Sequence, residues 1–152
     1  MSSVPSLPMQ QACAIPFRLV AGKVEVCVVT TIKKRRWSFP KGMIEPGEAP
    51  PQTALKEAWE EAGLRGRVIG DLIGSYVRKK YGIRLLVKCY LMHVNSQHRR
   101  WRESQLRERA WLPLDEALTT IDQVGQRKVL AAAQKVIQQQ KPTNGRERGA
   151  KG

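Results

Sequence analysis

The chain has 152 residues, with 27 Lys and Arg against 13 Asp and Glu, which gives a net charge of +14. Its length fits one domain with its own core. No segment approaches the ~20 apolar residues of a membrane span, and the N-terminal segment lacks the pattern of a secretory signal. Cys13, Cys27 and Cys89 lie in separate apolar segments, so they fit reduced core residues of a cytosolic, cytoplasmic protein better than a disulfide framework or a metal site. The surplus of positive charge predicts an anionic partner, such as a polyphosphate, a nucleotide or RNA.

The chain begins with a predicted flexible lead, a β-hairpin and a loop. Residues 1–10 combine prolines and serines and are expected to be flexible. Segments 12–20 and 24–32 are rich in apolar and β-branched residues and are separated by a short turn, which predicts two paired strands. Residues 36–51 contain several prolines and glycines that disfavour a regular element, so we expect a loop there.

A helix is predicted over residues 50–62. Pro50 and Pro51 suit its first turn, where a missing N–H matters least, and Gly63 suits the position just after its end. Its apolar residues are expected to face the core, and its glutamates are expected to lie on the other side. The apolar residues are Leu55, Ala58, Trp59 and Ala62.

The rest of the chain predicts further strands and helices. Residues 97–108 are polar and basic without periodicity, so we expect a loop, and residues 141–152 have nothing to pack and predict a disordered basic tail. This order predicts an α/β domain over residues 11–140, in which helices cover a mixed β-sheet. The other expected elements are a strand over 67–77 with a bulge near Gly70, strands over 84–94 and 109–112, and helices over 114–121 and 124–139.

An acidic cluster stands out in this basic chain, because five of the 13 acidic residues fall between Glu45 and Glu61. Glu57, Glu60 and Glu61 have i, i+3 and i+4 spacing, which places their carboxylates on one face of the predicted helix. These like charges weaken an isolated helix by about a few tenths of a kcal/mol per pair, and a bound Mg²⁺ or Mn²⁺ would reverse that effect because both ions select oxygen ligands. The same glutamates also fit a solvated helix face on which Lys56 pairs with Glu60.

The acidic cluster belongs to a longer pattern. Five residues separate Gly42 from Glu48, and seven more separate Glu48 from the run Lys-Glu-Ala-Trp-Glu-Glu-Ala-Gly-Leu at 56–64. This arrangement resembles the signature of the Nudix hydrolase family, and the Trp-Ser-Phe-Pro-Lys segment before Gly42 is also similar to it. The sequence departs from the signature at two positions, because Lys56 stands where the family has arginine and Ala58 stands where it has a larger aliphatic residue.

The resemblance implies an α/β/α sandwich with the signature in a loop–helix–loop, and attack of water on a phosphoanhydride bond with the help of Mg²⁺ or Mn²⁺. It implies that the three helix glutamates ligate the metal, that a backbone carbonyl near Lys41 or Gly42 completes the coordination, and that Glu48 assists directly or through water. Lys56 would orient a glutamate as the family's arginine does, although with a point charge in place of a fork. The predicted catalytic group is Lys56, Glu57, Glu60 and Glu61.

The catalytic base is open at this point. Glu57 fits the role, and so do Glu103 and Glu108, because the 97–108 loop is in a position to close over the helix. The two loop glutamates also fit plain ion pairs with neighbouring arginines.

One branch of the family is similar to this sequence in the hairpin, in the segment before the helix and in the strand near residues 85–94. That branch is the diadenosine polyphosphate and diphosphoinositol polyphosphate phosphohydrolases. The similarity implies a highly anionic small molecule as the substrate, either a nucleoside diphosphate linked to another group or an inositol polyphosphate. The basic residues expected to bind its phosphates are Lys33, Lys34, Arg35, Arg36, Lys41, Arg78, Lys79 and Lys80.

Two alternatives remain open. An RNA 5′-end pyrophosphohydrolase would use the same helix together with a basic surface and stacking aromatic residues, for which Trp101 and Trp111 are the candidates. A catalytically weak Nudix-like module that binds polyphosphate or nucleic acid would account for Lys56 in place of arginine. The sequence predicts no membrane partner and carries no prediction of the oligomeric state.

Overall fold

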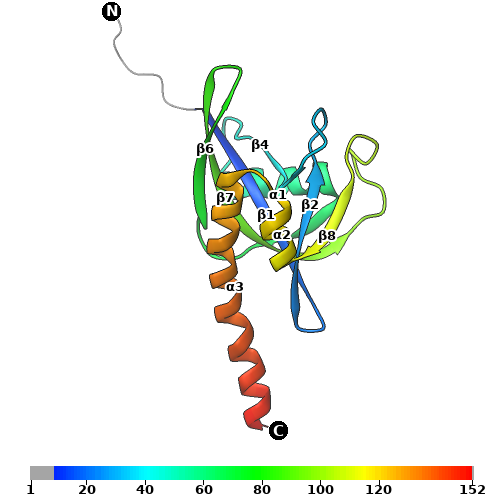
Figure 1. Ribbon diagram of the computed structural model, residues 1–152, viewed down its shortest axis with the longest axis vertical. Coiled ribbons are helices and arrows are strands. Elements are labelled where there is room, and N and C mark those ends of the chain that lie inside the picture. Colours follow the sequence, from blue (N-terminus) through cyan, green and yellow to red (C-terminus); the bar gives the residue numbers. More distant parts are fainter. Residues whose placement is uncertain (1–8, 152) are drawn as a thin grey trace, which may run out of the picture.

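A computed structural model describes the backbone of residues 9–151 and the side chains of residues 9–139. An eight-stranded mixed sheet has one helix on one face and two helices on the other, which is the predicted α/β sandwich (Figure 1). In chain order the elements are β1 (Met9–Val20), β2 (Lys23–Thr30), β3 (Trp37–Ser38), β4 (Lys41–Met43), α1 (Pro50–Ala62), β5 (Leu64–Val68), β6 (Gly74–Lys80), β7 (Ile83–Gln97), β8 (Arg109–Pro113), α2 (Leu114–Thr120) and α3 (Val124–Lys151).

The strand β1 is the centre of the sheet. It runs parallel to β7 and antiparallel to β2 and β4. Its hairpin with β2 confirms the predicted pair of strands, and the connection is tight because Ala21 and Gly22 both have positive φ, 52° and 78°. The short β4 pairs with the N-terminal part of β1, so the residues around Gly42 are fixed at an outer position of the sheet.

Two predicted elements differ from the structure. The strand expected over 67–77 is divided into β5 and β6, which both pair with β7. Between them Ile69 and Ile73 still donate backbone hydrogen bonds to Leu91 and Cys89 of β7, so the chain bulges away from its neighbour and returns. The predicted loop over 36–51 contains β3 and β4, because β1 and β2 offer backbone partners that no local pattern reveals.

The predicted terminal segments are only partly described. Residues 1–8 of the expected flexible lead lie outside the described residues, and Met9 and Gln10 begin β1. At the other end, the backbone of α3 continues as a helix through Lys151, where the sequence predicts a disordered tail from residue 141 (Figure 1). The predicted domain boundary at residue 140 is therefore not visible as a break in this helix.

Each face of the sheet has its own apolar core. On the face of α2 and α3 the core contains large residues such as Ile15, Leu91 and Leu130. On the α1 face it contains many small residues, which lets α1 approach β1 and β4 closely. The small residues are Ala12, Ala14, Ala54, Ala58 and Ala62, all without exposed surface.

All three cysteines are buried, as predicted for core residues. Among the described helices, none is long and apolar enough to cross a membrane.

Candidate active site

The helix α1 begins and ends where the sequence predicts. At its start the Ala49 N–H donates to the Gln52 side chain at 3.0 Å, and prolines occupy its first positions. At its end Gly63 has φ 68° and donates its N–H to the carbonyl of Trp59 at 3.0 Å. The predicted glutamate face is therefore held on a well-defined helix.

The prediction that α1 has one apolar side and one glutamate side is wrong for Glu61. Glu61 is 6% exposed and lies on the buried side of the helix, whereas Leu55 and Trp59 are only partly buried. The Lys41 N–H donates to Glu61 Oε1 at 3.3 Å, and Arg107 lies 3.5 Å from Glu61 Oε2. Burial raises the pKa of the Glu61 carboxyl to about 8, an effect that Arg107 opposes.

Glu57 forms a pair with this buried carboxyl group. Its side chain rests against the backbone of Gly42, where an added Cβ would overlap the carboxyl group. Burial raises the pKa of Glu57, a hydrogen bond with Glu61 opposes the rise, and the charge of Glu60 adds to it. A half-buried carboxyl group in contact with a buried one needs a proton or a cation between them, so this pair is the chemically distinctive point of the site.

Glu60 has a different partner. Its carboxylate forms an ion pair with the exposed Arg102 at 3.1 Å. Within the described residues, no three His, Cys, Asp or Glu side chains are already arranged around a common point as a metal site. In the structure Glu57 contacts Glu61, whereas Glu60 is held in a salt bridge with Arg102.

Glu48 and Lys56 hold the loop before the helix to the helix itself. Lys56 Nζ lies 2.7 Å from Glu48 Oε2 and 3.1 Å from Glu45 Oε2, so it does not form the alternative pair with Glu60. Glu48 Oε1 also accepts from Thr53 Oγ1 at 2.8 Å and from the Glu45 N–H at 3.1 Å. The bond from Lys56, followed by the one from Thr53, lowers the pKa of Glu48 to about 2. A direct role of Glu48 at a metal stays a prediction, since its contacts are those of a loop anchor.

Lys56→Met is expected to lower turnover by ~10–100-fold, the usual cost of losing a group that orients a metal site. The methionine keeps the length of the side chain but frees Glu48 and Glu45, so the loop between β4 and α1 loses its tie to the helix. Lys56→Arg is the matched control and is expected to keep turnover within about threefold, because arginine retains the charge. Steady-state kinetics with a phosphoanhydride substrate measures both, and equal rates for the Met and Arg variants would refute this role.

The stability of the metal-free protein is expected to fall as the pH rises from about 4.5 toward 8. The folded protein keeps a proton on Glu61 up to about pH 8, whereas the unfolded chain releases it near 4.5, so each step upward favours unfolding. Thermal denaturation in chelator across this range measures the slope, which Glu61→Gln should flatten and Glu116→Gln should leave intact. A slope that is unchanged in Glu61→Gln would contradict the assignment.

The predicted 97–108 loop covers the C-terminal end of α1, where helix carbonyls lack partners. Trp101 Nε1 donates to the Glu61 carbonyl at 2.8 Å, the His98 N–H donates to the Gly63 carbonyl at 2.9 Å, and the Glu103 N–H donates to the Glu60 carbonyl at 3.2 Å. The loop therefore lies beside the glutamates, as expected.

The structure separates the two loop candidates for the catalytic base. Glu103 Oε1 accepts from Arg107 Nε at 2.6 Å, and its charge contributes to the raised pKa of Glu57. Glu108 has a side chain that is 70% exposed and pairs with Arg35 at 3.0 Å. Glu103 thus lies near enough to the pair of Glu57 and Glu61 to affect it, whereas Glu108 is held at the surface by Arg35.

Arg107 is a site residue that the sequence does not reveal. Its side chain is 14% exposed and contacts Glu61, Glu103 and the carbonyl of Thr30, the last at 3.1 Å. It is one of many arginines in a basic segment, so only its burial against two acids distinguishes it.

The predicted phosphate-binding residues fall into two groups. Lys33 and Lys34 are exposed in the turn after β2, and their neighbours Arg35 and Arg36 pair with Glu108 at 3.0 Å and with Asp122 at 3.8 Å. This turn is not in contact with the glutamates of α1 through any described side chain.

The second group lies near β4 on the α3 face of the sheet. Lys41 Nζ donates to Ser38 Oγ at 3.3 Å, and burial, followed by the charge of Arg78, lowers the pKa of Lys41. Lys79 and Lys80 are exposed farther along the β6–β7 hairpin. Lys41 connects the two faces, because its backbone N–H bonds Glu61 while its side chain lies opposite Cys13 on the other face.

Polar side chains beside Lys41 were not predicted. Gln126 Nε2 donates to Ser38 Oγ at 3.0 Å and to the Tyr76 hydroxyl at 3.1 Å, and its Oε1 accepts from the Phe39 N–H at 3.2 Å. Gln11, which is 9% exposed, has an Oε1 with no partner among the described residues. Sequence patterns did not reveal this group because its members come from four distant segments.

Solved structures share this fold. The crystal structure of C. elegans Ap4A hydrolase has a TM-score of 0.73 and 23% identity, over 86% of this chain and 99% of that one. The NUDIX domain of Shewanella oneidensis NrtR, cocrystallised with ADP ribose, has a TM-score of 0.71 and 16% identity, over 87% and 90% of the two chains. These likenesses confirm the predicted Nudix α/β/α architecture.

The amino-acid sequence is also similar to that of a known Nudix hydrolase. Nudix hydrolase 4 of Arabidopsis thaliana is 33% identical over 96 residues, which is 62% of this chain and 46% of that protein. The present chain thus spans less than half of the length of that relative. The sequence profile of the NUDIX domain matches residues 11–133, and with the signature residues gathered on α1 and β4 this shows that the chain belongs to the NUDIX domain family.

Proposed function

We propose that this protein is a divalent-metal-dependent pyrophosphohydrolase that cleaves a phosphoanhydride bond in a highly anionic small molecule. The observation that carries the proposal is the contact between the half-buried Glu57, held against Gly42, and the buried Glu61, faced by Arg107. Carboxyl groups in such a position are costly without a cation, and enzymes concentrate groups with raised pKa values at reacting centres.

The residues present fit Mg²⁺ or Mn²⁺. The donors are hard oxygens, with Glu57 and Glu61 in contact and Glu60 available once it leaves the exposed Arg102. The backbone ligand of the metal would be the carbonyl oxygen of Lys41. The Lys41 N–H points to Glu61, and the N–H and C=O of one strand residue point the same way. The neighbouring Pro40 carbonyl is instead taken by the Ala14 N–H.

The chain's own residues supply the remaining chemistry. A bound divalent cation lowers the pKa of a water molecule and neutralises phosphate oxygens. Glu57 or Glu103 would accept the proton of the attacking water, and Arg107 would hold Glu103 and Glu61 in their places. Lys41 and Arg78 would bind the part of the substrate that passes to the α3 face.

The favoured substrates are diadenosine polyphosphates and diphosphoinositol polyphosphates. Two basic groups, one in the turn after β2 and one beside β4, suit a molecule with several phosphates, and the unpartnered Gln11 Oε1 offers an acceptor to a nucleobase or to a sugar hydroxyl. Structural neighbours are described as an Ap4A hydrolase and as a domain bound to ADP ribose, which supports a nucleotide-like ligand.

A panel of substrates tests the proposal. It contains diadenosine polyphosphates, diphosphoinositol polyphosphates, ADP-ribose, nucleoside triphosphates and 5′-triphosphorylated RNA, each with Mg²⁺, with Mn²⁺ and with chelator. Cleavage of one class that depends on the metal supports the function and identifies the branch. Absence of cleavage by the folded protein would favour the alternative of a binding module.

A further inference from the structure

We infer that a strip of three tryptophan–arginine pairs on the α1 face binds single-stranded RNA leading away from the carboxylates. This tryptophan strip consists of Trp59 with Arg65, Trp101 with Arg109, and Trp111 with Arg18. The inference goes beyond the proposed small-molecule substrate and rests on the proposed function only for the site at α1, because the strip would receive the chain attached to a 5′-polyphosphate held there.

Each pair places a guanidinium group over an indole ring. The distance from the arginine Cζ to the ring centroid is 3.8 Å at Trp59, 4.2 Å at Trp101 and 4.0 Å at Trp111. All three rings are partly exposed. Indole rings and guanidinium planes are the groups on which unpaired RNA bases stack, so the strip offers stacking surfaces of the right chemistry.

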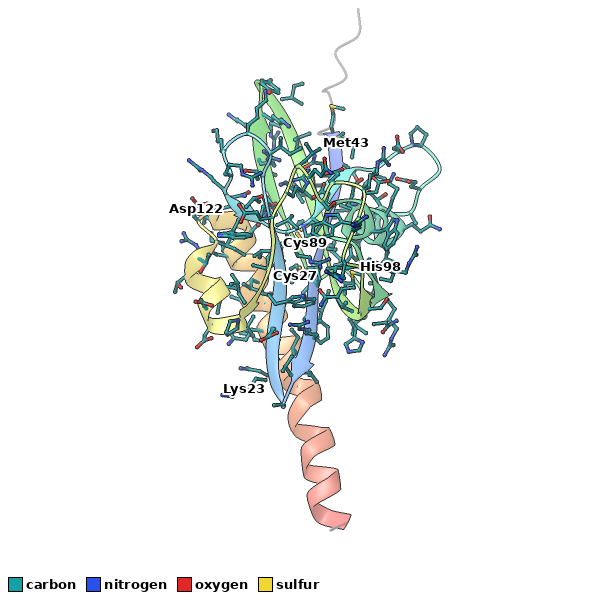
Figure 2. The ribbon with its side chains drawn as sticks, turned by 90° about the vertical axis from the view of Figure 1, so that its right-hand side faces the viewer. Lys23, Cys27, Met43, Cys89, His98 and Asp122 are labelled. Carbon is teal, nitrogen blue, oxygen red and sulfur yellow. The ribbon has the colours of Figure 1, made fainter. Side chains whose placement is uncertain are left out.

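The end of β7 and the following loop join the three pairs. Trp111 Nε1 donates to Gln97 Oε1 at 2.9 Å, and the next residue, His98, lies edge-on to Trp59 at 4.7 Å between ring centroids. Arg109 donates to the His98 carbonyl at 2.9 Å. Figure 2 shows His98 on the side of α1, whereas Asp122 lies on the opposite side near α2 and α3.

The strip begins at the catalytic helix. Trp101 Nε1 bonds the Glu61 carbonyl, and Trp59 is part of α1 itself. A nucleotide chain whose terminal phosphates lie at Glu61 would therefore meet Trp101 first and then the rings on either side of it.

The charge around the strip is positive and largely uncompensated. Arg99 and Arg100 are exposed and form no ion pair with any described residue, and neither does Arg65. Two cations of this region are paired, Arg102 with Glu60 at 3.1 Å and Arg18 of the strip with Glu25 at 2.8 Å. Free guanidinium groups beside stacking rings suit a polyanion with bases.

Two other anionic partners fit less well. A membrane surface would call for many apolar side chains next to the charges, and among the described residues the exposed large apolar side chains adjoining the strip in sequence are only Leu19 and Val20, beside Arg18, with none from segments 59–65 or 97–102. A compact polyphosphate would use Lys41 and Arg78 and would gain nothing from three aromatic rings.

Binding of a 5′-hydroxyl RNA of about ten nucleotides tests the strip in chelator, where no cleavage occurs. Because three of the four tryptophans lie in the strip, quenching of intrinsic fluorescence reports the binding. The variant combines Arg65→Gln, Arg99→Gln and Arg100→Gln, and the matched control combines Arg127→Gln, Lys128→Gln and Lys135→Gln on α3.

The strip variant is expected to weaken RNA binding by at least about tenfold. It should also lower the slope of log K against log salt by ~2, because each RNA phosphate that an arginine neutralises contributes ~0.7 to that slope. The α3 control is expected to bind like the wild type, and both variants should cleave the small substrate normally. Equal losses in the two variants, or no quenching in the wild type, would overturn the inference. Absence of small-substrate cleavage by the wild type with RNA binding retained would instead count against the proposed function alone.

Discussion

Glu61→Gln is expected to lower the turnover of a phosphoanhydride substrate by about a thousandfold, because it removes several kcal/mol of charge stabilisation from the transition state. The fold should persist, since a neutral amide of the same shape suits a position where burial raises the pKa of the carboxyl group. Glu60→Gln is expected to act in the same direction, because Glu60 is the third oxygen donor of the helix. Steady-state kinetics with saturating Mg²⁺ measures both variants, and circular dichroism verifies the fold.

Glu116→Gln provides the control for this experiment. It makes the same chemical change on the exposed surface of α2, far from α1 in the sequence, and should leave turnover at the wild-type level. Near-normal turnover in both Glu60→Gln and Glu61→Gln would show that these carboxylates do not hold the catalytic cation.

Gly42→Ala is expected to lower turnover by ~10²-fold with a small change in melting temperature, since displacing a reacting group by about 1 Å costs this much. The added Cβ would occupy the space of the Glu57 carboxyl group. That group is the far end of a flexible side chain, so it can rotate away at little cost in stability, but it then leaves Glu61. The result therefore separates the geometry of the carboxyl pair from the stability of the fold.

Gly74→Ala is the matched substitution for this prediction. Its Cβ would meet Val129 at 3.3 Å on the α3 face, away from the carboxyl pair, so turnover should stay normal even if the melting temperature changes. Normal turnover in Gly42→Ala would contradict the claim that close approach of Glu57 to β4 forms the site.

Local signals were sufficient to predict α1. Pro50 and Gly63 specify the two ends of the helix through backbone conformation, and the i, i+4 spacing of Glu57 and Glu61 brings these two side chains together. The burial of Glu61 could not be predicted in this way. It follows from the small side chains Ala12 and Ala14 on β1, which let α1 sink toward the sheet until Glu61 meets β4.

Long-range partners account for the other differences. Lys56 bonds Glu48 and Glu45 across the loop, whereas a helix considered alone offers Glu60 as its partner. Arg107 and Gln126 enter the site from segments whose patterns carry no chemical signal. These contacts depend on which strands become neighbours, and periodicity does not contain that information.

The central claim is that the carboxylates of α1 form a divalent-cation site, and Mn²⁺ binding followed by electron paramagnetic resonance tests it most directly. The wild type and Glu116→Gln should bind Mn²⁺ with the same affinity, and Mg²⁺ should compete. Glu61→Gln should weaken binding by at least about tenfold, since it removes a charged oxygen ligand. Unchanged Mn²⁺ affinity in Glu61→Gln would contradict the account.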